Sequence, residues 1–168
     1  MNLLKFFHLP IITVCFSLVA SIPVHAQESS PKPQNNWSVG CTSTARGAET
    51  DCRMEQQIVV AKTRQLLLQA TITIPGTTRK PILIFKSPTQ LLLTAGVTVD
   101  VDGTLSENLP YYTCDTQNCF ARAQLSDALL AAMKKGSELN VSFDNLNGNK
   151  IKVAMSLEGF TAAYTKVE

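Results

Sequence analysis

The residues with the most definite chemistry are four of the five cysteines, Cys41, Cys52, Cys114 and Cys119; the fifth, Cys15, lies within the first 26 residues, which we predict to be removed. A four-cysteine zinc site normally contains two close pairs, whereas ten residues separate the first two cysteines here. The second pair, Cys114-x₄-Cys119, lacks the Cys-x-x-Cys spacing of redox-active thiols. An even number of cysteines in an exported chain instead predicts two structural disulfides. Three pairings are possible. We favour Cys41–Cys52 and Cys114–Cys119, because each closes a short polar loop and contributes about 2–3 kcal/mol by chain entropy.

Histidine occurs only within the first 26 residues, as His8 and His25. Removal of that segment would leave a chain without histidine. Such a chain has no Ser–His–Asp or Cys–His nucleophile, no histidine metal ligand and no histidine pH switch. The sequence therefore predicts a protein that is not an enzyme.

Other patterns suggest chemistry, but each has a plainer explanation. Asp100-x-Asp102-Gly103 places two carboxylates beside a turn, yet a calcium loop would continue beyond the glycine to a terminal acidic ligand. Ser29-x-x-Lys32 matches a hydrolase motif but lies in a polar stretch that cannot preorganise a site. Nothing pairs two acidic residues across a cleft as a glycosidase requires. We predict no catalytic residue, no metal site and no cofactor.

A pair of adjacent tyrosines beside the second predicted disulfide is the best candidate for a binding surface. Adjacent residues of a strand face opposite sides, so either Tyr111 or Tyr112 should point outward. Exposed tyrosine is common in protein interfaces. We predict a binding patch formed by these tyrosines and the loop between Cys114 and Cys119. The loop residues are Asp115, Thr116, Gln117 and Asn118.

The N-terminal segment sets the compartment. Residues 1–26 combine Lys5, an apolar run over residues 9–19 and small residues at Val24 and Ala26, which is the pattern of a secretory signal peptide cleaved after Ala26. Prolines and serines interrupt the run, which falls short of the ~20 apolar residues of a membrane span. We predict an exported protein of a Gram-negative bacterium, periplasmic or at the outer surface, with no integral membrane span after cleavage.

One domain should follow the signal peptide. Residues 27–36 form a polar tail rich in Pro, Ser and Asn, which we predict to be disordered. Residues 37–168 have the length of a single domain. The formal net charge of the whole chain is only +2, which excludes a dedicated binder of nucleic-acid phosphates.

Short β-rich segments separated by turn residues dominate this domain. In the first segment, Trp37, Val39 and Cys41 should alternate inward. The β-rich segments lie at residues 37–41, 52–58, 66–74, 81–85, 91–93, 97–101, 111–114, 119–125, 138–143, 150–157 and 159–164. A single helix is predicted over residues 127–135, with Ser126 as its N-cap and Gly136 after its C-terminus.

Many short strands with one helix predict an all-β fold, an antiparallel immunoglobulin-like β-sandwich with two local disulfides. A true immunoglobulin domain would show a long-range Cys…Trp…Cys pattern, which this chain lacks. A membrane barrel is the rival all-β exported fold. The continuous apolar runs at residues 66–68 and 91–93 favour the buried strands of a sandwich.

The order and spacing of several landmarks resemble a known family. The landmarks are Trp37-x-Val39-x-Cys41, Cys52-x-Met54-x-Gln56, residues 91–102, Cys114-x₄-Cys119-x-Ala121, the helix with Lys135-Gly136, and residues 156–163. Over residues 37–164 the chain is similar to the bacterial invasion-associated locus B family. The resemblance implies an exported, disulfide-bearing β-sandwich of cell envelopes, involved in host-cell invasion in some members and without an established reaction. Asn118, in place of a usual glycine, and the polar residues 87–90 depart from the family pattern.

These features together favour a non-enzymatic envelope or surface binding module that contributes to host-cell interaction. Its partner would be a protein or a component of the host-cell surface. The alternative is a periplasmic assembly or stress factor that acts on other exported proteins by strand addition at exposed sheet edges. A hydrolase that uses carboxylates alone is the least favoured hypothesis.

Overall fold

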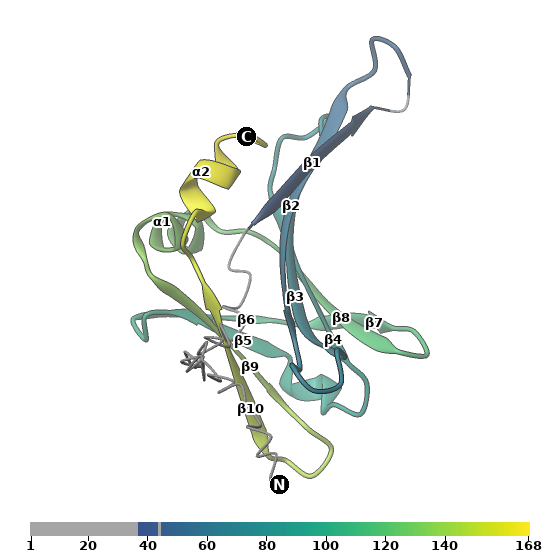
Figure 1. Ribbon diagram of the computed structural model, residues 1–168, viewed down its shortest axis with the longest axis vertical. Helices are drawn as coiled ribbons and strands as arrows, with labels where there is room; N and C mark the ends of the chain where they lie inside the picture. The colour runs from purple at the N-terminus through teal and green to yellow at the C-terminus, as the bar shows by residue number, and fades with distance from the viewer. Residues whose placement is uncertain (1–36, 44) are drawn as a thin grey trace, which may run out of the picture. The chain divides into compact units, whose positions relative to one another are not determined.

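Two antiparallel sheets make up most of the computed structural model, which describes residues 37–43 and 45–168 (Figure 1). The six-stranded sheet has the order β1-β2-β3-β4-β8-β7, with β1 Ser38–Ser43, β2 Thr50–Val59, β3 Leu66–Ile74, β4 Ile82–Pro88, β7 Tyr111–Cys114 and β8 Asn118–Gln124. The four-stranded sheet has the order β10-β9-β5-β6, with β5 Val97–Val101, β6 Leu105–Leu109, β9 Glu138–Asp144 and β10 Lys150–Ser156. The predicted signal peptide and tail lie outside the described residues.

Alternation along the strands builds the core. In β3, the side chains of Leu68, Ala70, Ile72 and Ile74 are buried while their neighbours are half-buried. Apart from β1, the other strands of both sheets contribute residues to the same apolar cluster, whose largest side chains include Phe85 and Phe143. Burial of such side chains is the main favourable term in folding. The predicted antiparallel β-sandwich is therefore confirmed.

Helix α1, Asp127–Lys135, has the predicted bounds and the predicted cap. The Ser126 Oγ accepts the N–H of Leu129 at 3.0 Å. Gly136 follows the helix in an extended conformation with φ of −78°. Only glycine fits at this position, because an added Cβ would overlap the side chain of Val101 and lie 2.9 Å from the Asp102 carboxylate.

The first strand differs from its prediction. Trp37 is buried, but every residue of β1 is exposed, Val39 and Cys41 included. The strand pairs only with β2 and forms one edge of the six-stranded sheet. Figure 1 shows this hairpin reaching beyond the rest of the two sheets. Val39 and Cys41 are exposed on this edge strand, although their partners on β2, Met54 and Cys52, are buried.

Residues 91–93 do not form the predicted strand. Leu91 is buried and makes an isolated bridge to Asn145, whereas Leu92 and Leu93 are exposed. A short 3₁₀ helix, η1, spans Leu93–Ala95. The segment connects β4 of one sheet to β5 of the other, so it runs across the end of the sandwich rather than within a sheet.

The predicted last strand is a second short helix, α2, spanning Phe160–Tyr164. Phe160, Ala163, Tyr164 and Val167 are all buried, and their spacing of three, four and seven residues is that of one helical face. The β-rich composition of the segment hid this period. Strand β6 was also missed, because its sequence LSENL has few of the residues typical of strands.

Antiparallel pairing gathers the connections at two ends of the sandwich. Residues 60–65, 89–96 and 145–149 connect β2 to β3, β4 to β5 and β9 to β10 at the same end. We call these three connections the η1 end. The turn of the β7–β8 hairpin lies near the same end. Asn118, the first residue after this turn, pairs with Pro88, the last residue of β4. The helices α1 and α2 lie at the other end (Figure 1).

Candidate functional site

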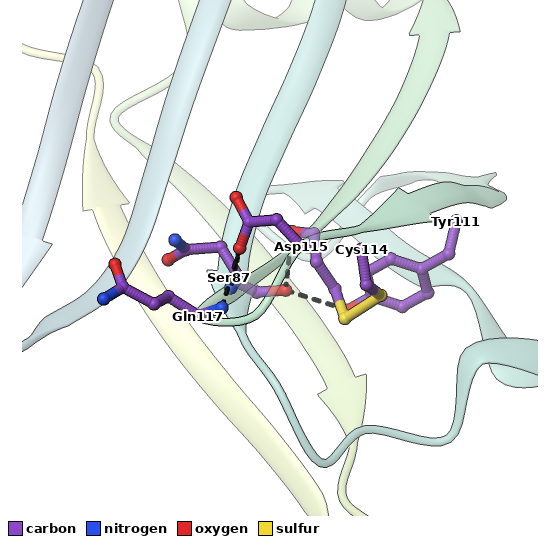
Figure 2. The surroundings of a disulfide bond; sticks show 7 residues. Ser87, Tyr111, Cys114, Asp115 and Gln117 are labelled. Atoms are coloured by element: carbon purple, nitrogen blue, oxygen red, sulfur yellow. Dashed lines mark hydrogen bonds between the residues drawn. A yellow bond between two sulfur atoms is a disulfide. The ribbon is translucent and has the colours of Figure 1, made fainter.

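The predicted binding patch lies on the β7–β8 hairpin, at the edge of the six-stranded sheet. Cys114 and Cys119 are directly paired across the two strands and form a disulfide, with their Cα atoms 4.0 Å apart. Figure 2 shows this disulfide beside the loop that it closes. The predicted pairing is confirmed, and it fastens the edge strand β7 to its neighbour.

Asp115 organises the loop. Its Oδ1 accepts the backbone N–H groups of Gln117 and Asn118, both at 2.7 Å. Its own N–H donates to the carbonyl of Asn118 at 2.8 Å. These two N–H donors hold the pKa of the Asp115 carboxyl below its ordinary value, because hydrogen bonds to the charged form favour it. The loop therefore has a fixed shape, with the side chains of Thr116 and Gln117 exposed.

Tyr111 belongs to the interior side of the hairpin. Its hydroxyl lies 3.2 Å from the Oγ of Ser87, a fully buried residue that also donates to the carbonyl of Cys119 at 3.4 Å. Burial raises the pKa of the Tyr111 phenol, and the hydrogen bond with Ser87 opposes this only in part. Tyr111 is consequently a structural residue of the hairpin (Figure 2).

Tyr112 is the tyrosine that faces solvent, with 54% of its surface exposed. The register of β7 against β8 shifts between Tyr111 and Thr113, and this irregularity presents Tyr112 at the edge. Its ring lies 6.4 Å from that of Phe120, centroid to centroid. Of the predicted patch, Tyr112, Asp115, Thr116 and Gln117 are exposed, whereas Tyr111 and Asn118 are half-buried.

Sequence analysis overlooked two residues beside this patch. Phe120 packs beside Tyr112, and Lys86, its partner across β4 and β8, lies near enough to Asp115 to lower the pKa of that carboxyl further. Both alternate with buried residues, Phe120 with Cys119 and Lys86 with Phe85. The two-residue period of these strands was the available signal.

The second disulfide joins Cys41 to Cys52, as predicted, across the paired strands β1 and β2. The six-stranded sheet has β1 and β7 as its two edges. Each edge strand is therefore covalently fastened to the strand inside it. Exposed edges are the parts of a sheet that detach most readily, so we expect the two disulfides to keep the edge strands attached.

The carboxylates of Asp100 and Asp102 have structural partners. Asp100 Oδ1 accepts the N–H of Gly103 at 2.8 Å and the side-chain amide of Asn140 at 3.0 Å. The two oxygens of Asp102 accept the N–H groups of Ser137 and Glu138, each at 3.0 Å. This arrangement holds the β5–β6 turn against the start of β9. It supports the interpretation of the motif as a turn.

Within residues 37–43 and 45–168, no three His, Cys, Asp or Glu side chains come together as ligands for a metal ion. In the same part of the chain, no helix has the length and apolar character needed to cross a membrane.

Comparison with known proteins identifies the family of this chain. The family model described as "Invasion associated locus B (IalB) protein" matches residues 37–168, which include both disulfides and the whole β7–β8 hairpin. This chain belongs to the IalB family. The resemblance predicted from the landmark residues is confirmed.

Relatives of this IalB protein come from Brucella abortus and Bartonella henselae. Two invasion protein B homologs of Brucella abortus, from strain 2308 and from biovar 1 strain 9-941, are each 30% identical over 154 residues, covering 90% of this chain and 86% of theirs. A crystal structure of invasion associated protein B from Bartonella henselae has a TM-score of 0.67 at 17% identity, over 78% of this chain and 90% of that one. The structural likeness shows a shared fold. The names of these relatives refer to invasion and to no reaction.

Proposed function

We propose that this IalB protein is an exported, non-enzymatic binding module that contacts a protein or surface component of host cells through its β7–β8 hairpin. The observation that carries the proposal is the exposure of Tyr112, 54%, beside a loop held by the Cys114–Cys119 disulfide and by Asp115. Tyrosine supplies a large amphipathic contact area and is enriched among the residues that dominate binding energy.

The fixed shape of the hairpin favours a role in recognition. Ordering a flexible loop on binding costs free energy, and a loop already held in its bound shape avoids that cost. The carboxylate of Asp115 accepts hydrogen bonds within the turn, and the hydroxyl of Tyr111 bonds to Ser87. The side chains of Tyr112, Thr116 and Gln117 are therefore available to contact a partner. Phe120 and Lys86 border them.

Export and host contact rest on separate arguments. The predicted signal peptide and the two disulfides support an oxidising compartment outside the cytoplasm. The invasion names of the Brucella abortus and Bartonella henselae relatives support a role at the host cell. A single domain over residues 37–168 would act alone once residues 1–26 are removed.

Binding to host cells tests the proposal. Fluorescently labelled protein comprising residues 27–168 would be titrated onto cultured host cells as wild type, as Tyr112→Ala and as Val39→Ser. Val39 provides the matched control, because it is also exposed, at 38%, but lies on the opposite edge strand β1. Loss of a dominant interface tyrosine costs about 2 kcal/mol or more, which is roughly a 30-fold weaker apparent affinity.

We expect wild type and Val39→Ser to bind cells equally and saturably, and Tyr112→Ala to bind at least tenfold more weakly. Circular dichroism would establish that the three proteins are equally folded. Equal binding by Tyr112→Ala and wild type would show that the hairpin is not the contact surface.

A further inference from the structure

Exposed apolar side chains are concentrated at one end of the molecule. Among the described residues, seven large hydrophobic side chains are exposed, and five of them lie at the η1 end or on the residue that leads into it. These five are Val59, Val60, Leu92, Leu93 and Leu146. Val39 lies on the distant β1 strand and Tyr112 on the β7–β8 hairpin.

Backbone hydrogen bonds join the two connections that carry the three exposed leucines. The N–H of Leu92 donates to the carbonyl of Asp144 at 2.8 Å, and the N–H of Leu146 donates to the carbonyl of Gln90 at 3.2 Å. The side chains of Leu92, Leu93 and Leu146 are 41%, 45% and 66% exposed. These bonds join the β4–β5 connection, which carries Leu92 and Leu93, to the β9–β10 hairpin, which carries Leu146.

The turn that carries Leu146 is rigid. The Oδ1 of Asn145 accepts the N–H groups of Asn147 and Asn149, both at 2.9 Å. Gly148 supplies the positive φ of 75° that the turn requires. Leu146 thus projects from a fixed turn at the tip of the β9–β10 hairpin, which Figure 1 shows as the part of the chain that extends furthest past the strands at this end.

The three connections at this end carry two basic residues, Lys62 and Arg64, and no acidic residue, while Asp115 lies on the neighbouring β7–β8 hairpin. The sequence contains no Asp or Glu between Glu55 and Asp100, a stretch that includes two of the three connections. Lys62 and Arg64 are exposed on the first connection, next to Val60. The acidic residue that precedes the third connection, Asp144, forms an ion pair with Lys150, with Oδ1 2.9 Å from Nζ.

We propose that the η1 end docks on the surface of an anionic lipid bilayer. Apolar side chains at the tips of loops can enter the interfacial layer, while adjacent cations contact lipid phosphates, and the two effects reinforce each other. Leu92, Leu93 and Leu146 would insert, and Lys62 and Arg64 would provide the attraction to anionic headgroups. A fluid bilayer can adapt to several separate projecting loops. A rigid protein partner would need a complementary pocket for each loop.

This inference stands apart from the proposed function. It concerns different residues from the Tyr112 patch, and purified protein can be tested on vesicles without a host cell. Failure to bind vesicles would leave the role of Tyr112 in host-cell binding intact, and the reverse also holds.

Vesicle co-sedimentation provides the test. Protein comprising residues 27–168 would be mixed with vesicles of equal parts phosphatidylglycerol and phosphatidylcholine, and with vesicles of phosphatidylcholine alone. We expect binding to the anionic vesicles that weakens with added salt, since interactions of exposed charges are screened. Binding to phosphatidylcholine alone should be at least tenfold weaker.

Three variants separate the contributions. The triple variant Leu92→Ser, Leu93→Ser, Leu146→Ser should bind anionic vesicles at least tenfold more weakly than wild type. The double variant Lys62→Gln, Arg64→Gln should bind more weakly and with less dependence on salt. Val39→Ser, which changes an exposed apolar residue on β1, should bind as wild type does.

Three results would overturn the inference. One is the absence of wild-type binding to anionic vesicles, and another is equal binding by wild type and the triple serine variant. The third is a wild-type dimer in sedimentation velocity that the triple variant dissociates, because the leucines would then form a contact between two copies of the chain. Circular dichroism on each variant would confirm that the fold is retained.

Discussion

Tyr111 and Tyr112 are neighbours in the chain, yet the fold uses them in opposite ways. The first bonds to the buried Ser87 and the second faces solvent. Strand alternation predicted that one of them would point outward, but it could not say which. The choice depends on Ser87, 24 residues away in sequence, and only the pairing of β4 with β8 brings Ser87 under the hairpin.

At the same scale, Asp115 predicts a pH dependence. Its pKa in the folded protein is lowered by the N–H groups of Gln117 and Asn118, whereas an unfolded aspartate has a pKa of about 3.9. The carboxylate therefore stabilises the loop at every pH above that value. The stabilisation is lost as the pH falls below it, through the lower pKa of the folded state.

Carbon-detected NMR of the side-chain carboxyl would measure this pKa directly, and we expect a value below that of an unstructured aspartate. The variant Asp115→Asn should lack the corresponding fall in unfolding free energy under acid conditions. A pKa at or above the ordinary value would contradict the role of Asp115 in fixing the loop.

At the scale of elements, the two disulfides fasten the edge strands β1 and β7, so their removal should act on stability. The chain-entropy relation predicts a loss of about 3 kcal/mol in unfolding free energy for Cys41→Ala with Cys52→Ala, and about 2 kcal/mol for Cys114→Ala with Cys119→Ala. Urea denaturation would measure both losses.

A thiol titration of the unreduced, denatured protein comprising residues 27–168 provides the control, and it should find no free thiol. Two or more free thiols would contradict the disulfides. Unchanged unfolding free energies in both double variants would contradict their stabilising role.

The elements that sequence predicted well are those whose patterns are local. The bounds and N-cap of α1 and the strand over residues 66–74 depend on neighbouring residues, and each was found where predicted. Residues 91–93 and the α2 segment failed for a different reason. Their conformations depend on the crossing between sheets and on the helical face that Phe160 and Tyr164 bury, which single segments do not reveal.

At the scale of the molecule, Trp37 connects distant parts of the chain. Its ring meets that of Phe160 edge-on, with centroids 5.1 Å apart. Its indole N–H donates to the carbonyl of Ser156 at 3.3 Å, and the side-chain amide of Gln56 donates to the same carbonyl at 3.2 Å. The six-stranded sheet, the end of β10 and α2 are joined at this point.

Removal of this connection should destabilise the whole fold. We expect Trp37→Ala to lower the unfolding free energy by about 3–5 kcal/mol, as other deletions of buried aromatic side chains do. Val39→Ser, two residues along and exposed, should change it by less than about 0.5 kcal/mol. Equal stability of the two variants in urea denaturation would contradict the central place of Trp37 in the packing.

The central claim is that this IalB protein is exported and meets its partner outside the bacterial cell. Its exposed lysines, among them Lys62, Lys80, Lys135, Lys152 and Lys166, make it a good target for an amine label that cannot cross membranes. Intact bacteria would be treated with that label, alongside a periplasmic control protein. We expect a labelled IalB protein and an unlabelled control. Labelling that requires a permeabilised outer membrane would contradict the claim and favour a periplasmic role on other exported proteins.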